Sequence, residues 1–86
     1  MARERIGEVL KFFSKPGVAA VKITAGKLHV GDTIRIMGHT TDLTEVVGSM
    51  EMDNSKVESA SIGDFVGIKI SDRVRAGDEV FKVTLE

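Results

Sequence analysis

The sequence predicts an all-β protein, a small antiparallel barrel of six to seven strands. A Gly-Asp pair occurs three times, each time after a small or branched apolar residue and before an extended run, at Gly31-Asp32, Gly63-Asp64 and Gly77-Asp78. Glycine adopts positive φ without steric cost and aspartate bonds nearby backbone N–H groups, so each pair predicts a tight turn. The β-branched residues that follow favour pleated strands. Short strands separated by turns in a short chain are typical of a barrel or sandwich.

Size and composition limit what the chain can be. Its 86 residues predict one domain, spanning 1–86, with a small core. With 12 Lys+Arg against 13 Asp+Glu, the formal net charge is −1, whereas nucleic-acid binders are usually basic. Contact with RNA would therefore need a local patch. The absence of cysteine excludes disulfides, a thiolate nucleophile and cysteine-ligated metal sites.

The absence of cysteine is compatible with the reducing cytoplasm, and a cytoplasmic protein is expected. Residues 1–5 carry mixed charges and lead into polar sequence, without the apolar segment of a signal peptide. No apolar run approaches the roughly 18 residues that a membrane-spanning helix needs. We expect no membrane contact.

The first two strands are predicted as a hairpin. Residues 5–13 form the first strand, but neither set of alternate residues is uniformly apolar, so its buried face stays open. Residues 14–17 form a turn, in which Pro16 presets φ and Gly17 allows a left-handed conformation. The second strand is predicted over residues 18–24.

The middle of the chain predicts two strands around a polar loop. After a turn at 25–27, a third strand is expected over 33–37, followed by a loop over 38–42 and a long fourth strand over 43–52. Alternation would place Val46, Gly48, Met50 and Met52 on one face, and Glu45, Val47, Ser49 and Glu51 on the other. A helix over 42–50 is disfavoured because the apolar period is nearer two. Met50 and Met52 are expected in the core rather than on an adaptable methionine surface.

Two further strands complete the prediction. Residues 53–56 turn the chain, and a fifth strand over 65–70 places Val66, Ile68 and Ile70 on one face. A connector follows at 71–75, and the last strand is expected over 79–85.

Four spaced segments resemble domain 2 of the translational GTPases, such as elongation factor Tu. They are G-K-L-H-V-G-D-T-I-R-I-M-G, S-M-E-M, V-E-S-A-S-I-G-D-F-V-G-I-K-I and R-A-G-D-E-V, and together they extend over about residues 6–83. The resemblance implies that family's antiparallel barrel. The chain is also similar to short translation elongation factor-like proteins and to the barrel at the end of the collagenase-like peptidases. No phosphate-binding G-x-x-x-x-G-K-[ST] loop is present, so this chain is not expected to bind GTP.

The resemblance also implies candidate binding residues. In elongation factor Tu, domain 2 helps to hold the aminoacylated end of tRNA, partly through the segment that matches 49–54 here. Glu51 and Met52 match the family pattern, whereas Asp53 and Asn54 stand where the family often has an aromatic residue and an arginine. Losing a stacking face and a cation weakens the case for a tRNA end.

A second candidate surface comes from the residues themselves. The polar loop is the most chemically varied in the chain and is a candidate for binding, because loops carry function on small barrels: His39, Thr40, Thr41 and Asp42. No metal-ligand spacing involves His39 or His29, so no metal site is expected. Lys69, Arg73 and Arg75, with Lys82, form either a basic patch or a solvated strand edge.

Two functions from different classes remain open. The first is a non-enzymatic adaptor of translation that contacts RNA, the ribosome, tRNA or a translation factor through the His39–Asp42 loop and the Glu51–Asn54 turn. The second is a protein-interaction subunit that completes a larger enzyme, for example of the collagenase-like peptidase family, without RNA contact. Neither requires a cofactor. An enzyme is disfavoured for want of a paired acid and base, and self-association through exposed strand edges stays open.

Overall fold

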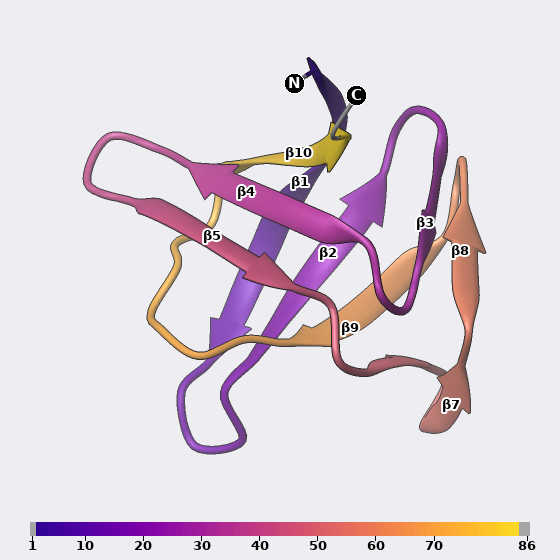
Figure 1. The fold of residues 1–86 in the computed structure, drawn as a ribbon. Helices are drawn as coiled ribbons and strands as arrows, with labels where there is room; N and C mark the ends of the chain where they lie inside the picture. The colour runs from indigo at the N-terminus through magenta and orange to yellow at the C-terminus, as the bar shows by residue number, and fades with distance from the viewer. Residues whose placement is uncertain (1, 85–86) are drawn as a thin grey trace.

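A computed structural model describes residues 2–84 and confirms an all-β, antiparallel, barrel-like fold (Figure 1). Its described part contains no helix. The strands are β1 Ala2–Phe13, β2 Val18–Ile23, β3 Lys27–His29, β4 Thr33–Met37, β5 Asp42–Val46, β6 Met50–Met52, β7 Ser55–Val57, β8 Ser59–Ser61, β9 Phe65–Lys69 and β10 Glu79–Thr84. The number of strands exceeds the six to seven predicted, because β3, β6, β7 and β8 have only three residues each.

Eight strands form one curved sheet and two form a short flap. The order in the large sheet is β5-β4-β10-β1-β2-β9-β6-β7, and β3 pairs with β8 separately. All pairings are antiparallel. Backbone bonds from Val30 N to Glu58 O and from Gly31 N to Val47 O connect the flap region to neighbouring segments. The sheet therefore curls around one core.

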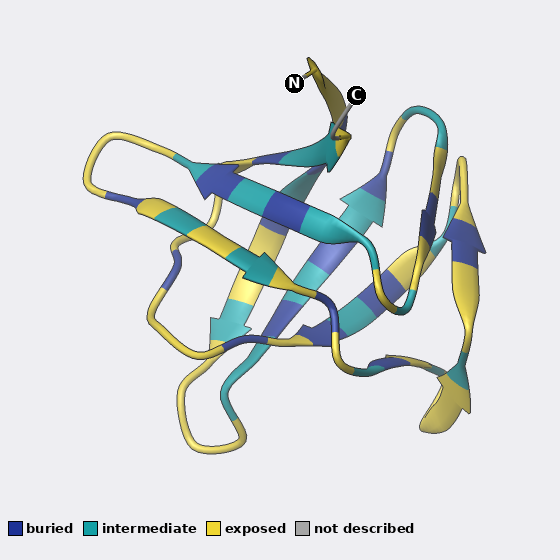
Figure 2. Cartoon of the chain, in the orientation of Figure 1, coloured by how far each residue is buried: buried dark blue, intermediate teal, exposed yellow. Residues whose placement is uncertain are grey.

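The core comes from alternate residues of most strands, as Figure 2 shows in dark blue. In β4, Ile34 and Ile36 are fully buried. The predicted inward face of the fifth strand is confirmed, because Val66, Ile68 and Ile70 are all buried, although β9 itself ends at Lys69. This alternation matches the period of two that pleated strands impose.

Two β-bulges explain the mixed pattern of β1. The register against β10 shifts between Arg5 and Gly7, and the register against β2 shifts between Val9 and Lys11. Each bulge inserts one residue and moves the inward face to the other parity. Ile6 and Val9 are buried despite their odd separation, while Leu10 is 42% exposed.

The predicted long strand over 43–52 is wrong. Residues 47–49 are not in a strand, and the chain turns there between β5 and β6. Val47 bonds to the backbone of Asp32 and Gly31 instead of continuing the ladder. The break reverses the predicted faces, since Val46 is 57% exposed and Val47 is 1% exposed. Met50 is buried as expected, and Met52 packs against the core.

The other bounds differ little from the predictions. β4 has the predicted bounds, β2 ends one residue early, and β1 begins three residues early. Of the predicted last strand, Leu85 lies outside the described residues. The predicted turn at 53–56 is shorter, because β7 already begins at Ser55.

Candidate interaction surfaces

A groove crosses the outer face of strands β1, β2, β9 and β6. Its floor is made of small residues, since Ala20 on β2 pairs directly with Gly67 on β9. A Cβ added to Gly67 would lie 3.1 Å from a methyl group of Val18, so little room remains beside the floor. The groove is a hollow of about 290 Å³ whose lining includes Leu10, Phe13, Ala20, Met52, Phe65 and Gly67.

The walls of the groove are exposed apolar side chains. Phe65 is 61% exposed, Phe13 is 43% exposed and Leu10 is 42% exposed. Lys22 lies 5.6 Å from the centroid of the Phe65 ring, and Lys11 lies 5.0 Å from that of Phe13. Both distances are within the range of a cation–π contact, and neither lysine lines the groove. We call this surface the Phe13–Phe65 groove.

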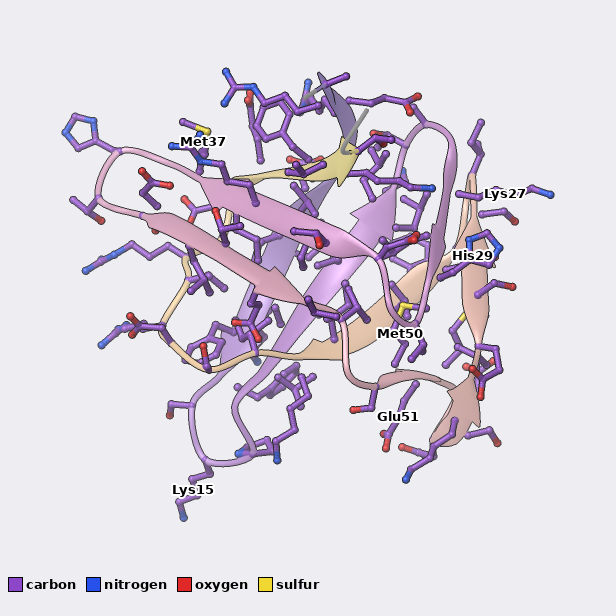
Figure 3. All side chains as sticks on the ribbon, viewed as in Figure 1. Lys15, Lys27, His29, Met37, Met50 and Glu51 are labelled. Carbon is purple, nitrogen blue, oxygen red and sulfur yellow. The ribbon has the colours of Figure 1, made fainter. Side chains whose placement is uncertain are left out.

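One end of the Phe13–Phe65 groove is formed by the turn between β6 and β7. Asp53 and Asn54 have φ of 50° and 65°, and Met52 pairs with Ser55, so the turn has two residues. Such hairpins favour Asn and Asp because both central residues are left-handed. Glu51, Asp53 and Asn54 all line the groove, and Figure 3 marks Glu51 near this end. Two carboxylates therefore stand beside an apolar hollow.

The His39–Asp42 loop forms a tight hairpin. Gly38 and Thr41 exchange backbone hydrogen bonds of 2.9 and 3.4 Å, which leaves His39 and Thr40 exposed at the tip. Thr41 is buried at 8% exposure. The loop is thus fixed by its own backbone.

Asp42 is bound to Arg35 of the neighbouring strand. Arg35 donates from Nε to Oδ1 at 2.9 Å and from Nη2 to Oδ2 at 3.0 Å. This bidentate hydrogen bonding holds the pKa of Asp42 below its usual value and raises that of Arg35. The Asp42 carboxylate is therefore already paired.

The structure brings this loop together with part of the basic patch. Thr40, Thr41 and Asp42 line a hollow of about 290 Å³ with Arg73 and Arg75, and with Leu43 and Asp72. Lys69 lines a different hollow, beside Glu45 and Ser71. Lys82 lies elsewhere, 3.4 Å from Asp32.

The two predicted binding segments do not share a hollow. The His39–Asp42 loop joins β4 to β5, whereas the Glu51–Asn54 segment joins β6 to β7 at the other end of the barrel (Figure 1). Within residues 2–84, no three His, Cys, Asp or Glu side chains gather as a metal site. None of these residues forms a helix long and apolar enough to span a membrane.

The sequence matches the elongation factor Tu domain 2 family over residues 17–80. The chain belongs to this family. The resemblance in the sequence is thereby confirmed, along with the fold that it implies. Membership in the family shows the barrel fold and does not show what its surfaces bind.

Similar proteins of greater length are peptidases by name. An uncharacterized protease of Methanocaldococcus jannaschii is 43% identical over 77 residues, covering 88% of this chain and 19% of that protein. A collagenase of Porphyromonas gingivalis is 35% identical over 78 residues, covering 90% of this chain and 22% of that protein. The chain thus spans about a fifth of the length of these relatives.

A solved structure shows the same fold. It is the C-terminal domain of a Geobacillus thermoleovorans protein assigned to the U32 peptidases, with a TM-score of 0.86 and 19% identity. The match covers 94% of this chain and 93% of that domain. Its selenomethionine variant gives a TM-score of 0.83 at 20% identity, covering 90% of this chain and 96% of that one.

The walls of the Phe13–Phe65 groove are not among the predicted binding residues. Leu10 and Phe13 belong to the strand whose mixed pattern leaves its buried face open, and Phe65 begins the strand for which only the face of Val66, Ile68 and Ile70 is predicted. A signal was present, because Phe65 precedes the inward-facing Val66 and must therefore face outward.

Proposed function

We propose that this chain is a non-catalytic interaction module of a collagenase-like or U32-type peptidase protein, and that its Phe13–Phe65 groove docks onto an apolar segment of the rest of that protein. The observation that carries the proposal is the exposure of Phe13, Phe65 and Leu10 around a floor without long side chains. Exposed aromatic clusters beside a hollow mark interaction sites.

The lengths of the relatives support the identity of the partner. The protease and the collagenase match this chain over a fifth of their own length. Their remaining four fifths would supply the surface that covers the groove. An interface between such units resembles a transient protein–protein interface, with a small apolar centre and a polar rim.

The charges of the groove favour a protein segment over RNA. Glu51 and Asp53 line it, and their carboxylates repel phosphate. Lys11 and Lys22 lie over phenylalanine rings at the rim. The overall charge of −1 gives no long-range attraction for RNA. The translation-adaptor hypothesis therefore becomes the competing outcome of the test.

The test is a calorimetric titration against the Methanocaldococcus jannaschii protease from which the matching segment has been removed. We expect binding that changes little with salt, whereas phosphate contact would make affinity fall steeply with salt. Phe65→Ser should weaken binding by about tenfold or more, because burying a phenylalanine contributes about 1.5–3 kcal/mol.

Ile62→Ser is the matched control, since Ile62 is 67% exposed and does not line the groove. It should leave binding unchanged. Absence of binding, or equal loss in both variants, would overturn the proposal. Salt-sensitive binding of a tRNA by the unmodified chain would support the translation hypothesis instead.

A further inference from the structure

Strand β5 is the open edge of the large sheet. It ends the strand order and pairs only with β4 among the described strands. Gly38 and Thr41 form a hydrogen-bonded pair at the start of this ladder, and Val47 N donates to Asp32 O at its end. In an antiparallel ladder such pairs alternate with pairs whose backbone groups point outward. The outward pairs involve Asp42, Thr44 and Val46.

The backbone groups of these three residues are unused. Within residues 2–84, their N–H and C=O groups form no hydrogen bond outside the β4 ladder. All three residues are exposed. The edge carries none of the lysines or prolines that commonly protect such strands, and both of its carboxylates are hydrogen-bonded, although only that of Asp42 is paired with a cation. Asp42 is bound by Arg35, and Glu45 is bound by Ser71.

The connector between β9 and β10 runs beside this edge without pairing with it. The connector contacts β5 through the Glu45 carboxylate, which accepts hydrogen bonds of 2.9 Å from the Ser71 N–H and from the Ser71 hydroxyl. Hollows of about 290 and 320 Å³ lie on either side of this link. We call these two hollows, with the Glu45 side chain between them, the β5 channel.

The cations beside the channel are free. Among the described residues, Arg73, Arg75 and Lys69 make no ion pair within 4.0 Å. Arg73 and Arg75 line the first hollow with two carboxylates. That of Asp42 pairs with Arg35, and that of Asp72 accepts a hydrogen bond from the Arg73 N–H but forms no ion pair. Counting Arg35, which pairs with Asp42, four cations stand against three carboxylates along the channel, so the excess is one positive charge, located at Arg73 and Arg75.

We infer that the β5 edge binds an extended, acidic peptide segment as an added strand. The N–H and C=O groups of Asp42, Thr44 and Val46 would complete a ladder with its backbone, and Arg73 and Arg75 would pair with its carboxylates. Backbone bonds supply affinity in this mode, and side chains along the channel supply specificity. The surface differs from the Phe13–Phe65 groove, so the inference does not depend on the proposed function.

The test uses a blocked heptapeptide of alternating glutamate and valine, titrated into the ¹⁵N-labelled chain. We expect chemical-shift changes and slowed hydrogen exchange at the amides of Asp42, Thr44 and Val46. The same peptide with lysine in place of glutamate should bind about tenfold more weakly, because it meets the arginines with like charge.

Two kinds of variant test the backbone hydrogen bonds and the arginine charges separately. Thr44→Pro removes one outward N–H without removing a bond to β4 and should weaken binding by about tenfold, whereas Thr44→Ala should leave it unchanged. If Thr44→Pro fails to fold, the exposed double variant Arg73→Glu with Arg75→Glu serves instead. It should reverse the preference between the two peptides.

Several results would overturn the inference. They are absence of any shift at millimolar peptide, shifts confined to Ala20, Phe65 and Gly67, or equal binding of the glutamate and lysine peptides. Concentration-dependent shifts of the β5 amides without peptide would assign the edge to a second copy of the chain instead.

Discussion

Arg35 and Asp42 form a bidentate pair across the β4–β5 ladder, with donor–acceptor distances of 2.9 and 3.0 Å. The pair lies at the start of the strand that forms the open edge of the sheet. It fixes the exit from the His39–Asp42 loop. It also removes from the edge a charge that would otherwise repel an acidic partner.

The pair makes stability depend on pH. Hydrogen bonding to Arg35 lowers the pKa of Asp42 in the folded state below its ordinary value of 3.8. The unfolded chain therefore takes up the proton first as the pH falls. The contribution of Asp42 to stability is complete above about pH 4 and is lost as the pH falls through the lower, folded pKa.

Urea unfolding of the unmodified chain and of Asp42→Asn between pH 2 and pH 7 checks this dependence. The variant should be less stable at neutral pH, and the difference should shrink below pH 4. Added salt should reduce the difference because the pair is exposed. A difference that persisted at pH 2 would show that the charge of Asp42 is not its source.

Substitutions of two adjacent valines, Val46 and Val47, test whether strand β5 ends between them. Val47→Ala should lower the free energy of unfolding by about 2 kcal/mol, because it removes two buried methyl groups and leaves a cavity. Val46→Ala should change it by less than about 0.5 kcal/mol, since Val46 is 57% exposed. Equal effects, or the reverse order, would favour a continuous strand over 43–52.

The first bulge of β1 depends on a residue without a side chain. A Cβ on Gly7 would collide with the carbonyl oxygen of Lys22 on the adjacent strand, a backbone atom that cannot move aside. Gly7→Ala should therefore lower the free energy of unfolding by more than about 2 kcal/mol, as measured by thermal and urea denaturation.

Gly48→Ala is the control for this measurement. No atom lies within 4 Å of a Cβ placed there, and Gly48 is not among the residues with positive φ. The substitution should be neutral, or should stabilise the chain by about 0.4–1 kcal/mol through the unfolded state. A tolerated Gly7→Ala would contradict the close approach of β1 and β2.

Local patterns predicted the regular strands and the fold class. β4 and β9 alternate without interruption, so the period of two alone places Ile34, Ile36, Val66 and Ile68 inside. The segments that match the family include turns, and the conformation of a turn also depends on residues that are adjacent in the sequence. Neither signal requires knowledge of which strands become neighbours.

The interrupted strands could not be predicted in this way. The bulges of β1 depend on its registers against β10 and β2, and the break after Val46 depends on backbone bonds from Val47 to Gly31 and Asp32. These partners are distant in sequence, and a shift of one residue exchanges the two faces of a strand.

The candidate surfaces, too, were determined partly by the sequence and partly by the tertiary structure. The sequence alone determined which polar residues stand at the loops, including His39, Asp42 and Asn54. Only the tertiary structure decided that the His39–Asp42 loop meets Arg73 and Arg75, and that Glu51 and Asn54 instead border the Phe13–Phe65 groove. The physical reason is that surfaces on a barrel are assembled across strands, and the order of the strands follows from the packing of one shared core.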